Sequence, residues 1–410
     1  MKPSGPIPPE YAGSARLSPA GRDFAEWIEA AGGTPLFVYD ARVMAARVAR
    51  FLAAFAGIDL HYAVKANPFA PLIEAIAPLV DGMDVASAGE MRLAAAQMAA
   101  ERISFAGPGK TDAELAAAIE AGVTLNLESA GEGERALRIA EGLGRAPRLA
   151  VRVNPDFELR GSGMRMGGRA SPFGVDADAA AALARRLIAG GADWRGWHIY
   201  TGSQALDPAA IIEMQAATLA LAARLSGEAG AAPPLVNLGG GFGVPYFAGD
   251  TALDVEAIGA ALGEALDRRP AALAESRFAI ELGRWLVAEC GVYLTTIVDR
   301  KVSRGETFLV TDGGLNHQLA ATGNFGSVVR RNYPVAIASA MAADASETVT
   351  VVGPLCTPLD RLADRVALPA AQPGDVVAVF LAGAYGKSAS PAAFLGHPPA
   401  REILAGSANP

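Results

Sequence analysis

The sequence predicts an α/β protein built from a (β/α)8 TIM-type barrel and a second, mostly β domain of the Greek-key β-barrel type. The first observation is an alternation of eight strand-like segments with helix-like segments between residues 59 and 290. Alternating strands and helices indicate a parallel sheet, and eight repeats favour its closure into a barrel. The second observation is that helical periodicity fades after residue 291. The third is the length of 410 residues, which is too great for one ordinary core.

The barrel elements are expected in a regular order, after a first helix at 40–55. The expected strands are 59–66, 82–87, 102–107, 123–128, 148–155, 195–204, 234–243 and 277–290. The expected helices between them are 68–80, 88–100, 111–122, 129–144, 176–191, 207–225 and 254–269. A capping box, in which a hydroxyl and a carboxylate satisfy free N–H groups, fits three helix starts. These are Ser87 with Glu90, Thr111 with Glu114, and Ser129 with Glu132.

The second domain is predicted from short strand-like runs. Residues 291–314 fit two strands around a turn, and 347–356 and 375–386 contain further short strands. The first 35 residues contain no clear element and are assigned to the same domain. We therefore expect a barrel domain at 36–290, and a β domain at 1–35 plus 291–410 that contributes to a dimer and to the active site.

Composition excludes several classes of function. The net charge is −8 and the isoelectric point about 5.2, without a basic stripe, so nucleic acid is not an expected partner. We expect no membrane association, because no signal peptide is evident and charges or small residues interrupt each apolar run. Two cysteines, Cys290 and Cys356, form no disulfide framework, which favours a cytoplasmic protein. No cluster has metal-ligand spacing, so no catalytic metal is expected.

The stretch HYAVKANPF places Lys65 at the end of the first barrel strand. Strand alternation puts His61, Ala63 and Lys65 on one face, with Lys65 at the carboxyl end, where barrel enzymes hold their active sites. One interpretation is an ordinary lysine whose ammonium group stays in water. The other is a desolvated lysine of lowered pKa that attacks a carbonyl. The chain has only five lysines, so few residues could perform that chemistry.

The seventh and eighth strands favour the second interpretation. NLGGGFG carries four glycines, and backbone without Cβ atoms can approach a phosphate and present several N–H groups to it. Barrel phosphate sites form after strands seven and eight, although a lone glycine run more often marks a turn. Arg284 can bind the same phosphate or a carboxylate. Glu281 can face a ring nitrogen or form an ordinary ion pair. A lysine imine, a phosphate cradle and a carboxylate for a pyridinium nitrogen together describe a pyridoxal phosphate site.

The sixth strand adds two candidates. His198 is either a satisfied core histidine or an imidazole against the cofactor ring. Ser203, in the following turn, can bond phosphate.

Several motifs carry a resemblance to a known family. YAVKAN, DVAS, GGGFG, ELGR, GPLC and GAYG occur in the order and spacing of the alanine-racemase-fold (fold type III) pyridoxal phosphate decarboxylases, which include diaminopimelate and ornithine decarboxylases. The likeness covers residues 34–400. RISFAGPGK, VNPDFELRGSGM and VSRGETFLVTDGG resemble the exosortase- and exopolysaccharide-associated subgroup most closely.

The resemblance implies a role for each matching residue. Lys65 would hold the cofactor as a Schiff base, His198 would stack on its ring, and Glu281 would pair with its nitrogen. Cys356, the implied proton donor, and Tyr385 would reach the active site of the partner subunit in a homodimer. Asp84 and Arg152 fall among the family's cofactor-site residues, where a supporting structural role is the favoured interpretation. The residues implied around the phosphate and the substrate are Ser203, Gly239, Gly240, Gly241, Gly283 and Arg284.

The implied reaction is decarboxylation of a basic or diamino-dicarboxylic amino acid. The sequence departs from diaminopimelate decarboxylases where side chains would meet the substrate. Thr357 replaces an acidic residue, although Asp360 is near, and LAATGNF (319–325) lacks the arginine and tyrosine for a distal carboxylate. The loop at 158–169 and the IYT between His198 and Gly202 also differ. An amino-acid racemase and a non-catalytic regulatory homologue remain as alternatives.

Overall fold

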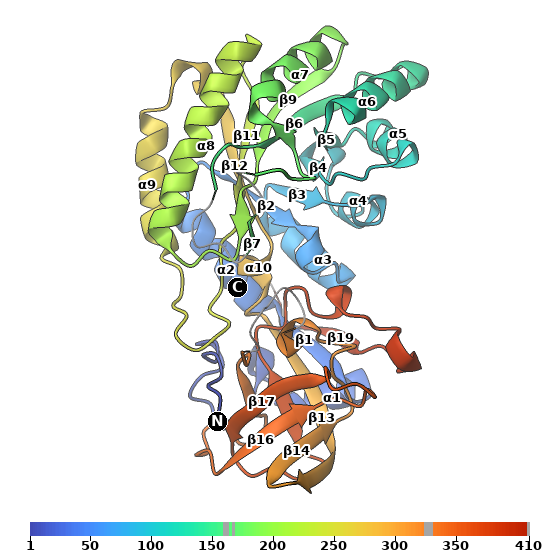
Figure 1. The fold of residues 1–410 in the computed structure, drawn as a ribbon, viewed down its shortest axis with the longest axis vertical. Helices are drawn as coiled ribbons and strands as arrows, with labels where there is room; N and C mark the ends of the chain where they lie inside the picture. The colour runs from blue at the N-terminus through green and yellow to red at the C-terminus, as the bar shows by residue number, and fades with distance from the viewer. Residues whose placement is uncertain (159–163, 166–168, 324–330, 408–410) are drawn as a thin grey trace. The chain divides into compact units, whose positions relative to one another are not determined.

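The structure is a computed structural model that describes residues 1–158, 164–165, 169–323 and 331–407 (Figure 1). The chain forms two compact units. The barrel unit comprises Val48–Gly243 and Leu253–Gly283. The β unit comprises Met1–Arg47, Val244–Ala252 and Arg284–Pro410.

The barrel unit contains the predicted closed ring of eight parallel strands. Its strands pair in the order β5-β4-β3-β2-β12-β11-β9-β6, and pairing of β5 with β6 closes the ring. The strands are β2 (Asp59–Ala63), β3 (Gly82–Val85), β4 (Ile103–Phe105), β5 (Thr124–Leu127), β6 (Arg148–Asn154), β9 (Asp193–Ile199), β11 (Leu235–Gly240) and β12 (Arg277–Leu282). Three two-residue strands add to them: β7 (Met164–Arg165), β8 (Val175–Asp176) and β10 (Gly202–Ser203).

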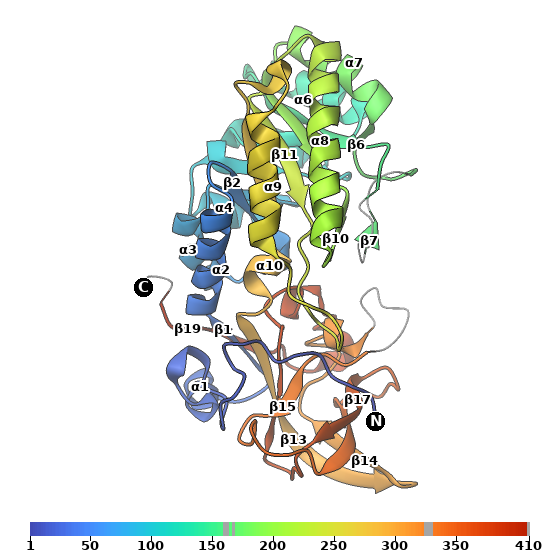
Figure 2. The same ribbon diagram turned by 90° about the vertical axis from the view of Figure 1, so that its left-hand side faces the viewer.

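Helices cover the ring, as the alternating pattern predicts. They are α3 (Ala70–Ile76), α4 (Ala88–Ala95), α5 (Asp112–Ala121), α6 (Ala130–Leu143), α7 (Ala177–Ala189), α8 (Pro208–Ala229) and α9 (Val255–Asp267). Figure 2 shows α8 and α9 side by side. By length and composition α8 could cross a membrane, which the sequence analysis did not expect of any segment. Its apolar residues are largely buried against neighbouring helices and β11, which is typical of a core helix.

Hydrogen bonds at the helix starts explain why these segments begin where they do. Thr111 and Glu114 form the complete capping box that the sequence predicts. Ser87 and Ser129 accept the expected backbone N–H groups. Their acidic partners bond differently: Glu90 accepts the N–H of Ala86, and Glu132 that of Glu128. All three helices are therefore capped by a hydroxyl, but only at α5 does the acidic side chain bond back to the N–H of the capping residue.

The β unit is organised around one mixed sheet. Its central path is β15-β18-β13-β14-β16-β17, and β1 joins β13 to β19. The β14–β16 and β1–β19 pairs are parallel. The remaining pairs of the sheet are antiparallel, and the sheet confirms the mostly β second domain. The strands are β1 (Leu36–Asp40), β13 (Gly291–Ser303), β14 (Glu306–Thr311), β15 (Val335–Ile337), β16 (Glu347–Val352), β17 (Arg361–Leu368), β18 (Val376–Val379) and β19 (Arg401–Ala405).

The compact units divide the chain at other places than the expected boundaries of 36 and 290. Strand β1 lies in the β unit because it pairs with β13 and β19 rather than with a barrel strand. Helix α1 (Phe24–Ala31), capped by Asp23, occupies a segment for which the sequence predicts no element. Two other helices begin in the β unit: α2 (Ala41–Ala54) and α10 (Arg284–Val287).

The barrel strands carry an unusual set of buried polar residues. Barrel interiors are ordinarily filled by bulky branched residues. Here each of the eight strands contributes at least one buried polar or charged side chain: His61, Asp84, Ser104, Asn126, Arg152, Asn154, His198, Asn237 and Glu281. Burying such groups is costly unless they pair with one another or with a ligand, so each of them needs a polar partner inside the barrel.

Candidate active site

Lys65 lies at the carboxyl end of β2, but not within the strand. The strand ends at Ala63, and Lys65 occupies a 3₁₀ turn formed by Val64–Ala66. Its side chain is exposed rather than desolvated, which corrects the expectation of a buried lysine. Its Nζ lies 5.6 Å from the centre of the Tyr200 ring. The turn directs the amine to the barrel mouth, because a 3₁₀ segment ends the strict alternation of the strand.

His198 and Glu281 form a buried pair at the carboxyl ends of β9 and β12. The Nε2 atom of His198 lies 3.1 Å from Oε2 of Glu281, and both side chains are more than nine-tenths buried. Burial alone would raise the pKa of Glu281, but the neighbouring His198, Lys65 and Arg152 lower it below its ordinary value. Glu281 is therefore held as a carboxylate, the form that a protonated ring nitrogen requires.

The glycine turn after β11 is built for close backbone approach. Gly239 and Gly241 have φ values of +71° and +81°, which side chains with a Cβ rarely adopt. A Cβ at Gly240 would lie 1.9 Å from the carbonyl oxygen of Glu281. The Oγ atom of Ser203 is buried and has no hydrogen-bond partner among the described residues. A free hydroxyl and a glycine turn that excludes side chains fit a bound phosphate.

Arg152 and its partners form a second buried group at the mouth. Its guanidinium lies 2.8 Å from the carboxylate of Glu128, which also accepts the N–H groups of Gly107 and Gly174. The same guanidinium faces the Tyr200 ring at 5.8 Å. Glu128 and Tyr200 were absent from the sequence-based candidates. The expected strand 123–128 ends in Glu128, and Tyr200 is part of the unusual IYT, so both carried a signal.

Asp84 pairs with a residue that the sequence analysis did not assign to the site. Its Oδ2 atom lies 3.4 Å from Nδ1 of His61, and both side chains are buried. Because Asp84 pairs with His61, its contact fits the structural role expected for it from the sequence. Gly283 packs closely against Ala66, the residue that follows Lys65, because a Cβ at Gly283 would lie 2.7 Å from the Cβ of Ala66.

The β unit carries the other predicted site residues. Arg284 donates to the hydroxyl of Tyr246 at 3.0 Å and lies over the Tyr385 ring at 4.6 Å. Tyr385 has a φ of +53°, a strained conformation that is typical of functional positions. Cys356 is exposed and free, whereas Cys290 is buried. Cys356 lies in the loop between β16 and β17, where its exposed thiol is available to a reacting group.

Two expectations about substrate contacts fare differently. Both carboxylate oxygens of the buried Asp360 accept backbone N–H groups, those of Leu315 and Leu355 at 2.6 and 2.8 Å. These bonds favour a role in holding the loop rather than in binding substrate. Thr357 is partly exposed and stays a candidate. Most of the glycine-rich loop at 158–169, and Asn324 and Phe325 of LAATGNF, lie outside the described residues.

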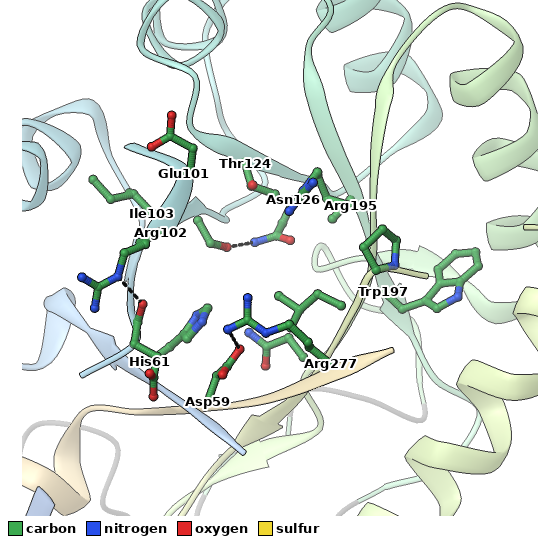
Figure 3. Close-up of a pocket in the computed structure, with 16 residues that line it drawn as sticks. Asp59, His61, Glu101, Arg102, Ile103, Thr124, Asn126, Arg195, Trp197 and Arg277 are labelled. Carbon is green, nitrogen blue, oxygen red and sulfur yellow. Dashed lines mark hydrogen bonds and ion pairs between the residues drawn. The ribbon is translucent and has the colours of Figure 1, made fainter. Parts of the chain in front are cut away.

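A separate cavity of about 340 Å³ opens at the opposite end of the barrel (Figure 3). Its lining includes the first residues of five strands: Asp59, Ile103, Thr124, Leu235 and Arg277. Barrel active sites lie at the carboxyl ends of strands, so this cavity is distinct from the candidate site.

An amine at the mouth of a (β/α)8 barrel, a phosphate-sized glycine turn and a buried carboxylate define a pyridoxal phosphate enzyme. The comparisons agree with this class. Residues 41–288 match the family described as "Pyridoxal-dependent decarboxylase, pyridoxal binding domain". The chain belongs to this family of pyridoxal-dependent decarboxylases.

Curated relatives span nearly the whole chain. The L-glutamyl-[BtrI acyl-carrier protein] decarboxylase of Niallia circulans is 38% identical over 90% of this chain and 88% of its own. The diaminopimelate decarboxylase of Archaeoglobus fulgidus is 31% identical over 91% and 88%. Among solved structures, diaminopimelate decarboxylase from M. jannaschii has a TM-score of 0.86 at 25% identity, covering 98% of this chain and 92% of the other. The protein is thus a pyridoxal 5'-phosphate-dependent amino-acid decarboxylase, similar to diaminopimelate decarboxylases.

Ser203 provides a direct test of the phosphate site. We expect Ser203→Ala to weaken binding of pyridoxal phosphate, because a hydrogen bond to a charged group contributes about 1.5–3 kcal/mol. The dissociation constant, measured by fluorescence titration, should rise roughly 10- to 100-fold. Ser276→Ala is the matched control, since Ser276 bonds Pro233 beside the amino end of β12. Equal affinity of Ser203→Ala and the wild type would remove Ser203 from the site.

Proposed function

We propose that the protein decarboxylates a basic or diamino-dicarboxylic amino acid, with Lys65 as the residue that binds the cofactor aldehyde. The observation that carries the proposal is the placement of Lys65, the glycine turn and the His198–Glu281 pair at the carboxyl ends of strands of one barrel. Pyridoxal phosphate, when bound, supplies an electron sink for the carbanion left by departing carbon dioxide.

The residues of the mouth divide the work of binding and orientation. Glu281, ionised beside His198, would hold the proton of the ring nitrogen. Gly239–Gly241 and Ser203 would hold the phosphate, and Arg284 the phosphate or the substrate carboxylate. Lys65 would exchange the aldehyde with the substrate amine and recover it when the product leaves. His198 would cover one face of the ring.

We assign the proton delivered to the substrate Cα to Cys356 of the partner subunit in a homodimer. Its thiol is exposed and unpaired with the other cysteine, so it can act between molecules. Two free thiols also fit a cytoplasmic enzyme. Tyr385, strained in the same unit, would contribute to the shared site.

Cys356→Ala should lower the rate of normal product formation by roughly 10²–10⁴-fold, the usual contribution of a positioned proton donor. Carbon dioxide release should fall less than amine formation, because misplaced protonation diverts the substrate into abortive transamination. Product analysis by mass spectrometry measures the ratio. Cys290→Ala, at a buried thiol that bonds the carbonyl of Val287, should retain the normal ratio. Full normal turnover of Cys356→Ala would refute the assignment.

A second candidate substrate is a glutamyl group carried on an acyl-carrier protein. The relative with that activity is 38% identical, whereas the diaminopimelate decarboxylase of A. fulgidus is 31% identical. The replacement of an acidic residue by Thr357 also favours a distal group other than the free amine of diaminopimelate. This substrate would present the same α-amino and α-carboxyl groups to the barrel.

One assay separates the candidates. Carbon dioxide release should be measured with diaminopimelate, lysine, ornithine, arginine and a glutamyl-carrier conjugate. Turnover of a free basic or diamino-dicarboxylic acid supports the first candidate, and turnover of the conjugate alone supports the second. Loss of substrate chirality without carbon dioxide would support a racemase instead. Protein that takes up no pyridoxal phosphate would favour the regulatory alternative.

A further inference from the structure

His61 occupies an uncommon position in the barrel. It lies on β2 with Asp84 of the neighbouring β3 at 3.4 Å on one side. On the other side, its Cα is the direct register partner of Glu281 on β12. Neighbouring residues in register point to the same face of a sheet. His61 therefore lies between the carboxylate of Asp84 and the carboxylate expected to hold the cofactor nitrogen.

His61 also lines the cavity at the amino end of the barrel. Figure 3 shows it on the same side of the cavity as Arg102 and Asp59. The side chain of His61 is only 10% exposed, and its Nδ1 atom, 3.4 Å from Oδ2 of Asp84, makes no hydrogen bond among the described residues. The cavity therefore gives access to the buried imidazole of His61 from the amino end of the barrel, opposite the candidate active site.

The charged groups around His61 favour its protonated form. The negative charges of Asp84 on β3, Asp59 on β2 and Glu281 on β12 each raise the pKa of His61. Asp59 is neutralised by Arg277 at 2.6 Å, and Arg102 adds a cation at the cavity wall. Burial, the largest single influence, lowers the pKa of His61, but the carboxylates of Asp84, Asp59 and Glu281 together outweigh it and the pKa is raised overall. The barrel thus favours a positive charge at His61, whose Cα is in register with that of Glu281.

We propose that His61 is a positioning residue for the cofactor: its imidazolium, held by Asp84, adds to the cations that keep Glu281 ionised and exchanges its proton with solvent through the amino-end cavity. The inference rests on the proposed role of Glu281. It adds that the charge on the cofactor nitrogen depends on a residue reached from the opposite end of the barrel. Loss of the His61 proton removes a cation from beside Glu281, which makes the local potential more negative and strengthens the hold of Glu281 on the ring nitrogen's proton.

The sign of the pH dependence follows from the raised pKa. A histidine with a folded pKa above about 6.5 is charged below that value and loses its charge as pH rises through the folded pKa. The effect of His61 on Glu281 should therefore be present at low pH and be lost on the alkaline side. The absorbance of the bound cofactor should show a corresponding transition.

The first experiment needs no cofactor. Histidine-labelled protein contains four histidines, so the His61 imidazole signal can be assigned by comparison with His61→Gln and titrated by NMR. Asp84→Asn should lower the pKa of His61 by roughly 1–3 units. Glu281→Gln should also lower it, by less. An unchanged pKa of His61 in Glu281→Gln would overturn the coupling, even where His61→Gln itself fails to fold.

The second experiment uses the protein loaded with pyridoxal phosphate. The alkaline transition in cofactor absorbance should disappear in His61→Gln and move to lower pH in Asp84→Asn. Ser104→Ala, which alters the same cavity, and His317→Gln, a buried histidine paired with Tyr293 in the β unit, should leave it unchanged. A transition identical in His61→Gln and wild type would refute this inference alone. Failure of every variant and of the wild type to bind the cofactor would instead refute the proposed function.

Discussion

Lys65→Ala is expected to lose essentially all decarboxylation while the chain remains folded. Among the described residues, Lys65 supplies the amine at the barrel mouth that can form an imine with the cofactor aldehyde, and arginine cannot replace it there. Because Lys65 is exposed, although its neighbours Val64 and Ala66 in the turn are buried, truncating its side chain leaves no cavity in the core. The loaded wild type should show an absorbance band near the visible edge, which Lys65→Ala should lack.

Two controls test whether the chemistry is specific to Lys65 rather than to any lysine of the chain. Borohydride reduction of the wild type should label one peptide, the one that contains Lys65. Lys301→Ala, at an exposed position of β13, should keep the band, the label and the activity. Labelling at another lysine, or a retained band in Lys65→Ala, would contradict the proposed role.

Lys110→Met is expected to cause the largest loss of stability. Lys110 and Glu132 form an ion pair of 2.7 Å with side-chain exposures of 1% and 2%. The ammonium also donates to the carbonyls of Gly107 and Asn126. Removing one partner leaves an uncompensated buried charge, so the free energy of unfolding should fall by about 3–5 kcal/mol. Urea unfolding followed by tryptophan fluorescence measures the change.

Two further variants test the cause. Lys387→Met makes the same substitution in a partly exposed pair with Glu402 and should cost no more than about 1 kcal/mol. The double variant Lys110→Met/Glu132→Leu removes both charges and should recover part of the lost stability. A double variant no more stable than Lys110→Met would show that packing, and not the unpaired charge, causes the loss.

The strands and helices of the barrel could be predicted from local sequence patterns. Alternating hydrophobic strands and capped helices repeat along the barrel, and each such unit carries its own periodicity and stop signals. The expected strand at 148–155 therefore overlaps β6 almost completely. Strands β1, β17 and β19 carry no comparable signal. Their identity depends on pairing partners far along the chain, as β1 shows by joining β13 and β19.

The candidate site shows the same division. Lys65, the glycine turn and Glu281 stood out because a cation, consecutive glycines and a carboxylate are rare within barrel strands. His61, Glu128 and Tyr200 did not, because a histidine, a glutamate or a tyrosine at a strand end has many ordinary uses. Their importance appears only when register and distance are known, as for His61 beside Glu281.

The order of residues alone determined the eight-fold alternation, the cofactor class and the lysine proposed to bind the cofactor, because these depend on periodicity and on scarce chemical groups. Tertiary structure alone decided that Lys65 leaves its strand for a turn, that β1 joins the second unit, and that buried charges from different strands become neighbours. Such pairings arise across closed sheets, where residues more than two hundred positions apart stand in register, as His61 and Glu281 do.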